Sequence, residues 1–190
     1  MFRFVAAGFT MVELITVIVL MGILSAVGAA RFFDDTVFEA RAYSDQAKSL
    51  VRYAQKLAIA QNRAVFVRAN QGGFAVCFQA NCGADAELAN APAGANSGTL
   101  TTRSHCLLGG AYVSRWLCEG LPAKVALTGN GIAAPLVNGF YFDAMGRPYN
   151  IGDAIGASTF TPLTLTFASG ASRYQFVIAA DTGYVYEPKQ

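Results

Sequence analysis

The sequence predicts an α+β protein, in which a long N-terminal helix precedes a head of antiparallel β-strands. Three observations lead to this fold class. Residues 9–30 are apolar apart from one carboxylate, residues 34–63 keep a helical spacing of apolar side chains, and short β-like runs separated by turn residues follow from residue 64. A set of strands that follows one helix, without alternating with further helices, favours an antiparallel sheet.

The first element is the apolar segment from Phe9 to Ala30, in which Glu13 is the only ionisable side chain. A helix needs about 20 apolar residues to cross a bilayer. The sequence therefore predicts a transmembrane helix over residues 9–31. A carboxylate within such a helix is costly, so we expect Glu13 to have a cationic partner.

The eight residues before this segment, MFRFVAAG, place the basic Arg3 and the small Gly8 ahead of the apolar run. A secretory leader has the opposite order, with the apolar stretch before the small-residue cleavage site. Cleavage after Gly8 would therefore remove only the charged leader, and the helix would begin at Phe9 with a free amine. If Arg3 stays on the cytoplasmic side, the head lies on the other side of the membrane.

The second element is the amphipathic half of the helix, residues 32–63, which contains no Pro or Gly. Side chains recur there at spacings of three and four, which is typical of one helix face. This face consists of Tyr43, Ala47, Leu50, Ala54, Leu57 and Gln61, widened by Val51, Ala58 and Ile59. We expect one continuous helix from about Phe9 to Asn62, whose second half packs on the head.

The third element is the head, residues 64–190, with short β-like runs bounded by turn residues. The runs are AVFVRAN, FAVCFQA, KVALTG, GFYFDAMGRPY, TPLTLTFAS, SRYQFVIAA and GYVYEP. Gln71-Gly72-Gly73 joins the first two runs and predicts a hairpin. Residues 81–104 are polar and small without a clear period, so we expect a long loop.

The N-terminal residues Gly8-Phe9-Thr10-Met11-Val12-Glu13-Leu14 resemble the class III signal of type IV prepilins and pseudopilins. This resemblance implies that a prepilin peptidase cuts after Gly8 and methylates Phe9. It also implies that Glu13 acts in assembly by pairing with the Phe9 amine of a neighbouring subunit. Many major pilins have a proline farther along this helix, and this chain has none around residues 29–30.

The head contains a second resemblance. Phe142-Asp143-Ala144-Met145-Gly146-Arg147 is similar to the F-D-x-x-G-R segment of the GspH/FimT group of minor pseudopilins, and the closing Gly183-Tyr184-Val185-Tyr186 is also similar. The group implies a pilin fold, with two antiparallel sheets packed against the helix. Residues 81–122 have no part in the resemblance. We expect the guanidinium of Arg147 to bond local carbonyls or Asp143 rather than a ligand.

The resemblance implies a minor pilin or pseudopilin, a structural subunit of a type IV pilus or a type II secretion filament, in initiation or at the tip. One placement is among the minor subunits of the mannose-sensitive haemagglutinin type of pilus, which the chain resembles in general form. The implied partners are other pilin or pseudopilin subunits, the prepilin peptidase and the inner-membrane assembly platform. The implied location is the bacterial inner membrane with the head in the periplasm, followed by a cell-surface pilus or a periplasmic pseudopilus.

An alternative of another class is a tip-located module that binds a ligand, either DNA or a surface. The net charge of +2 and the tail VYEPKQ give no basic stripe, so we do not expect nucleic-acid binding. We also expect no enzymatic activity and no cofactor. The chain has one histidine, His105, and lacks both G-x-S-x-G and the phosphate-binding G-x-x-x-x-G-K-[ST].

Four cysteines lie in the head: Cys77, Cys82, Cys106 and Cys118. Their spacing matches zinc-finger pairs poorly, so we expect no metal site. An exported domain with an even number of cysteines favours disulfides, and four cysteines allow three pairings. Proximity along the chain favours Cys77–Cys82 with Cys106–Cys118, while the crossed pairings remain open.

The inverted leader predicts where the chain is processed. Mass spectrometry of the protein extracted from membranes should show a chain that begins at methylated Phe9. A bulky residue in place of Gly8 should block this cleavage. An intact Met1, or cleavage within residues 20–30, would contradict the prediction.

Overall fold

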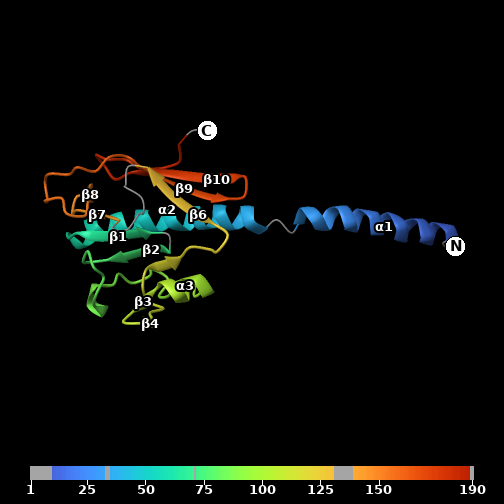
Figure 1. Ribbon diagram of the computed structural model, residues 1–190, viewed down its shortest axis with the longest axis horizontal. Helices are drawn as coiled ribbons and strands as arrows, with labels where there is room; N and C mark the ends of the chain where they lie inside the picture. The colour runs from blue at the N-terminus through green and yellow to red at the C-terminus, as the bar shows by residue number, and fades with distance from the viewer. Residues whose placement is uncertain (1–9, 33–34, 71, 131–138, 189–190) are drawn as a thin grey trace, which may run out of the picture. The chain divides into compact units, whose positions relative to one another are not determined.

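The computed structural model describes residues 10–32, 35–70, 72–130 and 139–188 (Figure 1). Its contacts divide the chain into two compact units, Met1–Asp35 and Thr36–Gln190. The processing residues Gly8 and Phe9 lie outside the described residues, as do residues 33–34, on which the expected continuity of one long helix depends.

The N-terminal unit contains α1, Met11–Phe32. Its first turn is capped by Thr10, whose Oγ1 accepts a hydrogen bond from the backbone N–H of Glu13 at 3.3 Å. Large apolar side chains are exposed all around the described part of this helix, from Met11 at 84% to Leu24 at 70%. Within the described part of the chain, no helix combines the length and the apolarity that crossing a membrane requires.

Helix α2, Asp35–Gln61, packs into the head with the face that the sequence predicts. Tyr43 and Leu50 are buried on this face, together with small side chains that include Ala47 and Ala54. The prediction is wrong at the C-terminal end, where Ile59 is 51% exposed and Gln61 is also exposed. The helix spacing continues to the end of α2, and Ile59 stays largely exposed although it borders Gly146, where an added Cβ would lie 2.8 Å from its Cδ1.

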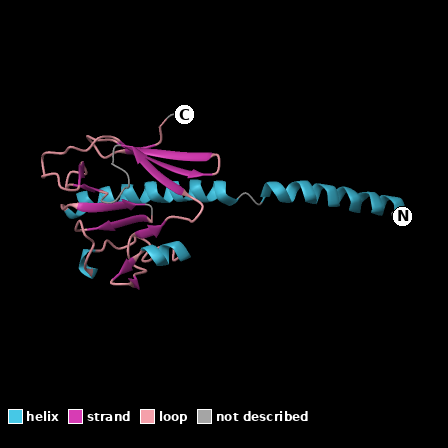
Figure 2. Cartoon of the chain, in the orientation of Figure 1, coloured by secondary structure: helices cyan, strands magenta, loops and turns pink. Residues whose placement is uncertain are grey.

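Two antiparallel sheets form the body of the head (Figure 2), which confirms the α+β class expected from the sequence. The first has the order β5-β2-β1-β7-β8, with β1 Val65–Asn70, β2 Gly73–Cys77, β5 Cys118–Gly120, β7 Phe140–Phe142 and β8 Pro148–Asn150. The second has the order β11-β10-β9-β6, with β6 Ala126–Asn130, β9 Leu163–Ser169, β10 Ser172–Ile178 and β11 Val185–Tyr186. The short hairpin of β3, Leu107–Leu108, and β4, Ala111–Tyr112, completes the strands.

The main core lies where α2 meets both sheets. The ring of Tyr43 on α2 lies 6.2 Å from that of Phe74 on β2 and 5.8 Å from that of Phe167 on β9, measured between ring centroids. Phe74 and Phe167 themselves stack at 6.1 Å. Aromatic pairs at these separations add to the stabilisation from burial alone. This ring triad therefore ties the helix to both sheets at one point.

The segment expected to be a long loop is more ordered than the sequence predicts. It contains the 3-10 turn η1, Asp85–Glu87, and helix α3, Leu100–His105. Thr99 caps α3, because its side chain accepts a hydrogen bond from the N–H of Thr102. Thr102 is fully buried, and its hydroxyl donates to the carboxylate of Glu119 and accepts from the N–H of Gly120 on β5.

The four cysteines form two disulfides, Cys77–Cys82 and Cys106–Cys118, which is the pairing that proximity favours. The first closes the segment that follows β2, and the second encloses the β3–β4 hairpin. Gly109 and Gly110 turn this hairpin with φ of 58° and 85°, a conformation that glycine adopts without strain. With Trp116, the disulfides form a small core of their own beside the first sheet.

The Cys106–Cys118 bridge should order its own loop more than it stabilises the whole head. Closing a loop of about 15 residues is worth roughly 3 kcal/mol, so this shorter loop should contribute somewhat less. In the variant with both cysteines replaced by serine, amide hydrogen exchange should speed up over residues 107–118 while β9 and β10 stay protected. Loss of protection in β9 and β10 to the same extent would contradict this separation.

Candidate assembly site and the paired turns of the head

Glu13 lies in the first turn of α1, on the exposed N-terminal end of the described helix. A carboxylate in the first turn interacts favourably with the positive end of the helix dipole. Its side chain forms no hydrogen bond or ion pair with any residue in the part of the chain that the structure describes. Glu13, the one charged group of residues 11–24, is thus without a partner among the residues that the structure describes.

Thr16 also belongs to this end of α1. Its hydroxyl donates hydrogen bonds to the backbone carbonyls of Val12, at 3.0 Å, and Glu13, at 2.9 Å. The polar hydroxyl is therefore satisfied within the helix, which leaves the Glu13 carboxylate as the group that requires an external partner.

The resemblance segment in the head forms the turn between β7 and β8. Asp143 is buried, and its Oδ1 accepts hydrogen bonds from the N–H groups of Met145 at 2.9 Å and Arg147 at 2.8 Å. The backbone carbonyl of Asp143 accepts a further bond from the N–H of Gly146 at 2.9 Å. Gly146 has φ of 78°, so the position favours glycine. These contacts give Asp143 and Gly146 a structural role in the turn.

A second turn packs on the first. A Cβ placed on Gly183 would lie 2.4 Å from the backbone oxygen of Gly146 and 2.8 Å from the ring of Phe142. Gln55 of α2 joins both turns, since its amide nitrogen donates to the carbonyls of Gly146 at 2.9 Å and Thr182 at 2.8 Å. The two glycine turns and Gln55 thus connect one end of both sheets to the helix.

Among the described residues, the side chain of Arg147 does not form the local hydrogen bonds that the sequence predicts for its guanidinium. Its backbone N–H, rather than its guanidinium, is the group that bonds Asp143. The side chain is exposed, and no hydrogen bond or ion pair joins it to another described residue. The structure therefore gives a reason for Phe142, Asp143 and Gly146 at this turn, and none for the guanidinium.

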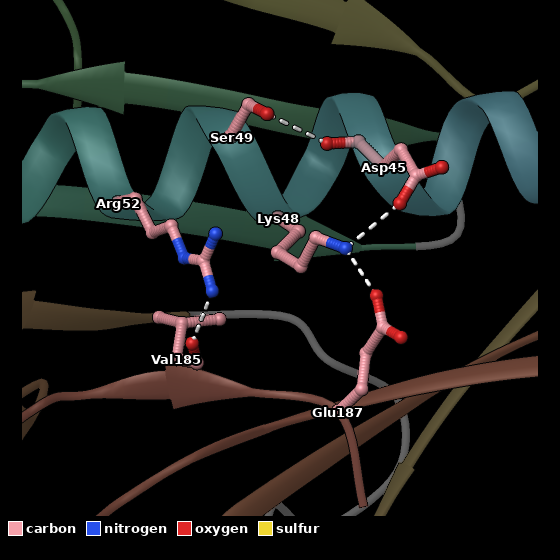
Figure 3. A network of polar contacts seen from close by, with 6 residues as sticks. All are labelled: Asp45, Lys48, Ser49, Arg52, Val185 and Glu187. Carbon is pink, nitrogen blue, oxygen red and sulfur yellow. Dashed lines mark hydrogen bonds and ion pairs between the residues drawn. The ribbon is translucent and has the colours of Figure 1, made fainter.

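The last strand is held to α2 by a polar network (Figure 3). Lys48 lies between Asp45, at 2.8 Å, and Glu187, with which it forms a close ion pair. Arg52 donates to the backbone carbonyl of Val185 at 2.6 Å. The hydrogen bonds from Lys48 to both carboxylates raise the pKa of its ammonium. Exposed ion pairs are individually weak, so this network fixes the position of β11 more than it stabilises the head.

The chain is similar to a few solved structures, whereas its sequence alone finds no match. No protein-family model matches the chain, and no curated protein matches it in sequence. Among solved structures, it is similar to the type IV minor pilin FimU of Pseudomonas aeruginosa at 12% identity, with a TM-score of 0.46 over 80% of this chain and 89% of that one. Another crystal form of FimU gives 11% identity and a TM-score of 0.44, over 78% of this chain and 92% of that one.

The chain is also similar to the minor pseudopilin EpsH from the type 2 secretion system of Vibrio cholerae. The identity is 12% and the TM-score is 0.46, over 82% of this chain and 97% of that one. The matched structures are thus one minor pilin, in two crystal forms, and one minor pseudopilin.

The Asp143 turn should be important for the stability of the head. Asp143→Ala would leave the partly buried N–H groups of Met145 and Arg147 without their acceptor, at a cost of about 1–3 kcal/mol. Arg147→Gln is the matched control, and should change stability by less than about 0.5 kcal/mol. Urea unfolding followed by the fluorescence of Trp116, the sole tryptophan, measures both variants. Equal effects of the two substitutions would contradict the structural role of the carboxylate.

Proposed function

We propose that this protein is a minor pilin or pseudopilin, a structural subunit of a type IV pilus or a type II secretion filament. One observation carries the proposal. Glu13 is a single carboxylate in an apolar helix, five residues after a Gly8-Phe9 junction at which cleavage would create a free amine. A simple membrane anchor needs neither the carboxylate nor the free amine. A filament in which the carboxylate of one subunit pairs with the amine of the next needs both.

The charge pair explains why assembly would be favourable. While the subunit waits in the membrane, the Glu13 carboxylate has no partner among the described residues and carries a desolvation penalty. In a bundle of such helices, the Phe9 amine of a neighbouring subunit would reach the same depth as Glu13. Pairing removes the penalty and at the same time fixes the axial register of the two subunits.

The same proposal covers the remaining processing steps and partners. The prepilin peptidase would remove residues 1–8 and methylate Phe9, and the inner-membrane platform would move the subunit into the filament. Residues 9–31, which include residues outside the described ones, would form the transmembrane helix on the strength of their sequence. The head would face the periplasm, where disulfides form and persist.

We place the subunit in initiation or at the tip of the filament, as the resemblance to minor pseudopilins implies. There the outer surface of the head is not covered by other subunits and is available to other molecules. A second hypothesis is therefore a tip-located module that binds a ligand. The observation that favours it is a cavity in the head that Arg68 and His105 line.

The assembly role of Glu13 predicts a selective defect. Glu13→Ala should insert into the membrane at least as well as the parent, because it removes a buried charge. Its incorporation into sheared filaments should fall about tenfold, which corresponds to the loss of ~1.4 kcal/mol of pairing. Glu39→Ala is the matched control, because Glu39 is an exposed carboxylate on α2.

Quantitative immunoblotting of sheared filaments against the membrane pool measures both variants. Equal incorporation of Glu13→Ala and the parent would contradict pairing through this carboxylate.

A further inference from the structure

A cavity of about 350 Å³ opens in the part of the head that the sequence resemblance does not cover. Its walls come from the β1–β2 hairpin, the segment closed by Cys77–Cys82, the end of α3 and the β3–β4 hairpin. The volume lies near the lower end of the range for small-molecule sites, which matches a ligand of about one ring.

Arg68 supplies a permanent positive charge to this cavity. It lies on β1 opposite Ala75 of β2, and its Nη1 donates to the backbone carbonyl of Asn81 at 3.0 Å. No ion pair joins its guanidinium to a carboxylate of the described residues. The other N–H groups of the guanidinium can therefore donate to a ligand, and their planar arrangement matches the two oxygens of a carboxylate.

His105 lies against the turn of the β1–β2 hairpin, close to Arg68. A Cβ placed on Gly72 would lie 2.6 Å from its Nδ1, so the absence of a side chain at Gly72 makes room for the imidazole. Burial lowers the pKa of His105, and the positive charge of Arg68 lowers it further. The imidazole forms no hydrogen bond with another residue in the described ranges.

Two amide side chains add further donors. The Oδ1 of Asn70 accepts the N–H of Gly72 at 2.8 Å, which leaves its NH₂ group for a ligand. The side chain of Asn81 lines the cavity and forms no hydrogen bond with another described residue. Arg68, His105 and the two amides therefore present donors without an acidic side chain among the residues that line the cavity.

The charged groups around His105 are few. Glu87 of η1 is the carboxylate near the rim, and it already accepts the N–H groups of Gly83 and Ala84 at 2.8 and 3.1 Å. Arg103 of α3 lies over the ring of Tyr112, at 5.7 Å from its centroid. Glu119 of β5 is bonded by Ser97 and Thr102. Arg68 is thus the charge that acts on the imidazole most directly.

Apolar side chains also line the cavity. Leu107 and Leu108 of β3 are among them, with Leu107 42% exposed and therefore accessible. Trp116 belongs to the lining as well, and its indole N–H donates to the carbonyl of Val76 at 2.9 Å. The lining thus combines cationic and donor groups with apolar side chains.

We infer that this cavity binds a small organic carboxylate of about one ring, such as an acidic monosaccharide. The carboxylate would bond the free edge of the Arg68 guanidinium and the imidazole of His105, and the body of the ligand would lie against Leu107 and Leu108. The inference names a ligand class for the hypothesis of a ligand-binding head. It does not depend on whether the chain enters a filament.

Binding and the titration of His105 would be coupled. Because its pKa lies below the usual value, His105 is neutral near pH 7 and gains its proton as the pH falls. A bound carboxylate offsets the charge of Arg68 and favours the imidazolium, so the ligand raises the pKa of His105. By linkage, affinity for the carboxylate increases as the pH falls through this pKa.

His105 is the only histidine of the chain, so its imidazole is a direct spectroscopic probe. The experiment uses the mature full-length protein in nonionic detergent with ¹³C-labelled histidine. The Cε1–H signal is titrated from pH 8 to pH 5 with and without sodium galacturonate at constant ionic strength. The expected result is a rise of about one unit in the pKa of His105, which means that the protonated form binds tenfold more tightly.

Controls separate this site from general charge effects. Galactose, which has the same ring without the carboxylate, should leave the pKa unchanged. Arg68→Gln should abolish the effect of galacturonate. Arg103→Gln, on the same side of the head but outside the cavity lining, should retain it. Arg68→Lys keeps the charge without the planar fork, and should weaken binding severalfold if the first variant fails to fold.

Two results would overturn the inference. One is the absence of any pKa change at galacturonate concentrations about tenfold above 1 mM, the weakest dissociation constant that we expect for this arrangement. The other is an equal change with inorganic phosphate or with Arg68→Gln, which would show a general response to anions. Normal filament incorporation of Arg68→Gln would separate either failure from that of the assembly proposal.

Discussion

The head depends on the contact of one narrow helix face with two sheets that share no strand. Small side chains on this face, Ala47 and Ala54 among them, are fully or almost fully buried in the core that α2 shares with the head. Tyr43 then fills the space where the sheets meet, with its ring against Phe74 and Phe167 and its hydroxyl donating to the carbonyl of Glu119 at 3.0 Å. Burial raises the pKa of this phenol, which therefore stays a neutral donor.

At the other end of the head, Gln55 joins α2 to both sheets through hydrogen bonds. It joins two turns that lie 91 and 127 residues away in the sequence. The ring triad and the glutamine thus fix the sheets on α2 at two separate places. This arrangement leaves the additional β3–β4 hairpin and α3 outside the main core, held by the Cys106–Cys118 disulfide and by the hydrogen bond from Thr102 to Glu119.

The N-terminal unit is stabilised by different interactions from those of the head. Large apolar side chains are exposed over residues 11–24 of α1, and Glu13 is the one charged group of that stretch. Such a helix gains stability from a surrounding apolar phase, while its carboxylate gains stability from a cation within that phase. In the proposed function, neighbouring subunits satisfy both requirements. The head has its own core and would serve recognition rather than attachment.

Much of this fold could be predicted from local patterns. The alternation in VFVRAN and LTLTFAS gives β1 and β9, and the spacing from Tyr43 to Ala54 gives the buried face of α2, because period and burial are coupled in each element. The exposure of Ile59 could not be predicted in this way, since the helix period does not show how far the head covers each position.

Helix α3 was not predicted from the sequence, for a different reason. It is short, and it is stabilised by the bond from Thr102 to Glu119, 17 residues farther along the chain. The role of Gln55 depends on even more distant turns and has no local signal. The cavity beside His105 also combines several segments that lie apart in the sequence, so no local pattern indicated a binding site there.

The central claim is that Glu13 and the Phe9 amine of a neighbouring subunit form a charge pair within a filament. The most direct measurement is zero-length crosslinking of isolated filaments with an apolar carbodiimide, followed by mass spectrometry of the N-terminal peptides. The account predicts an amide between Glu13 of this protein and the terminal amine of another subunit. Recovery of Glu13 only as an unlinked carboxyl or its carbodiimide adduct, in filaments that contain the protein, would contradict it.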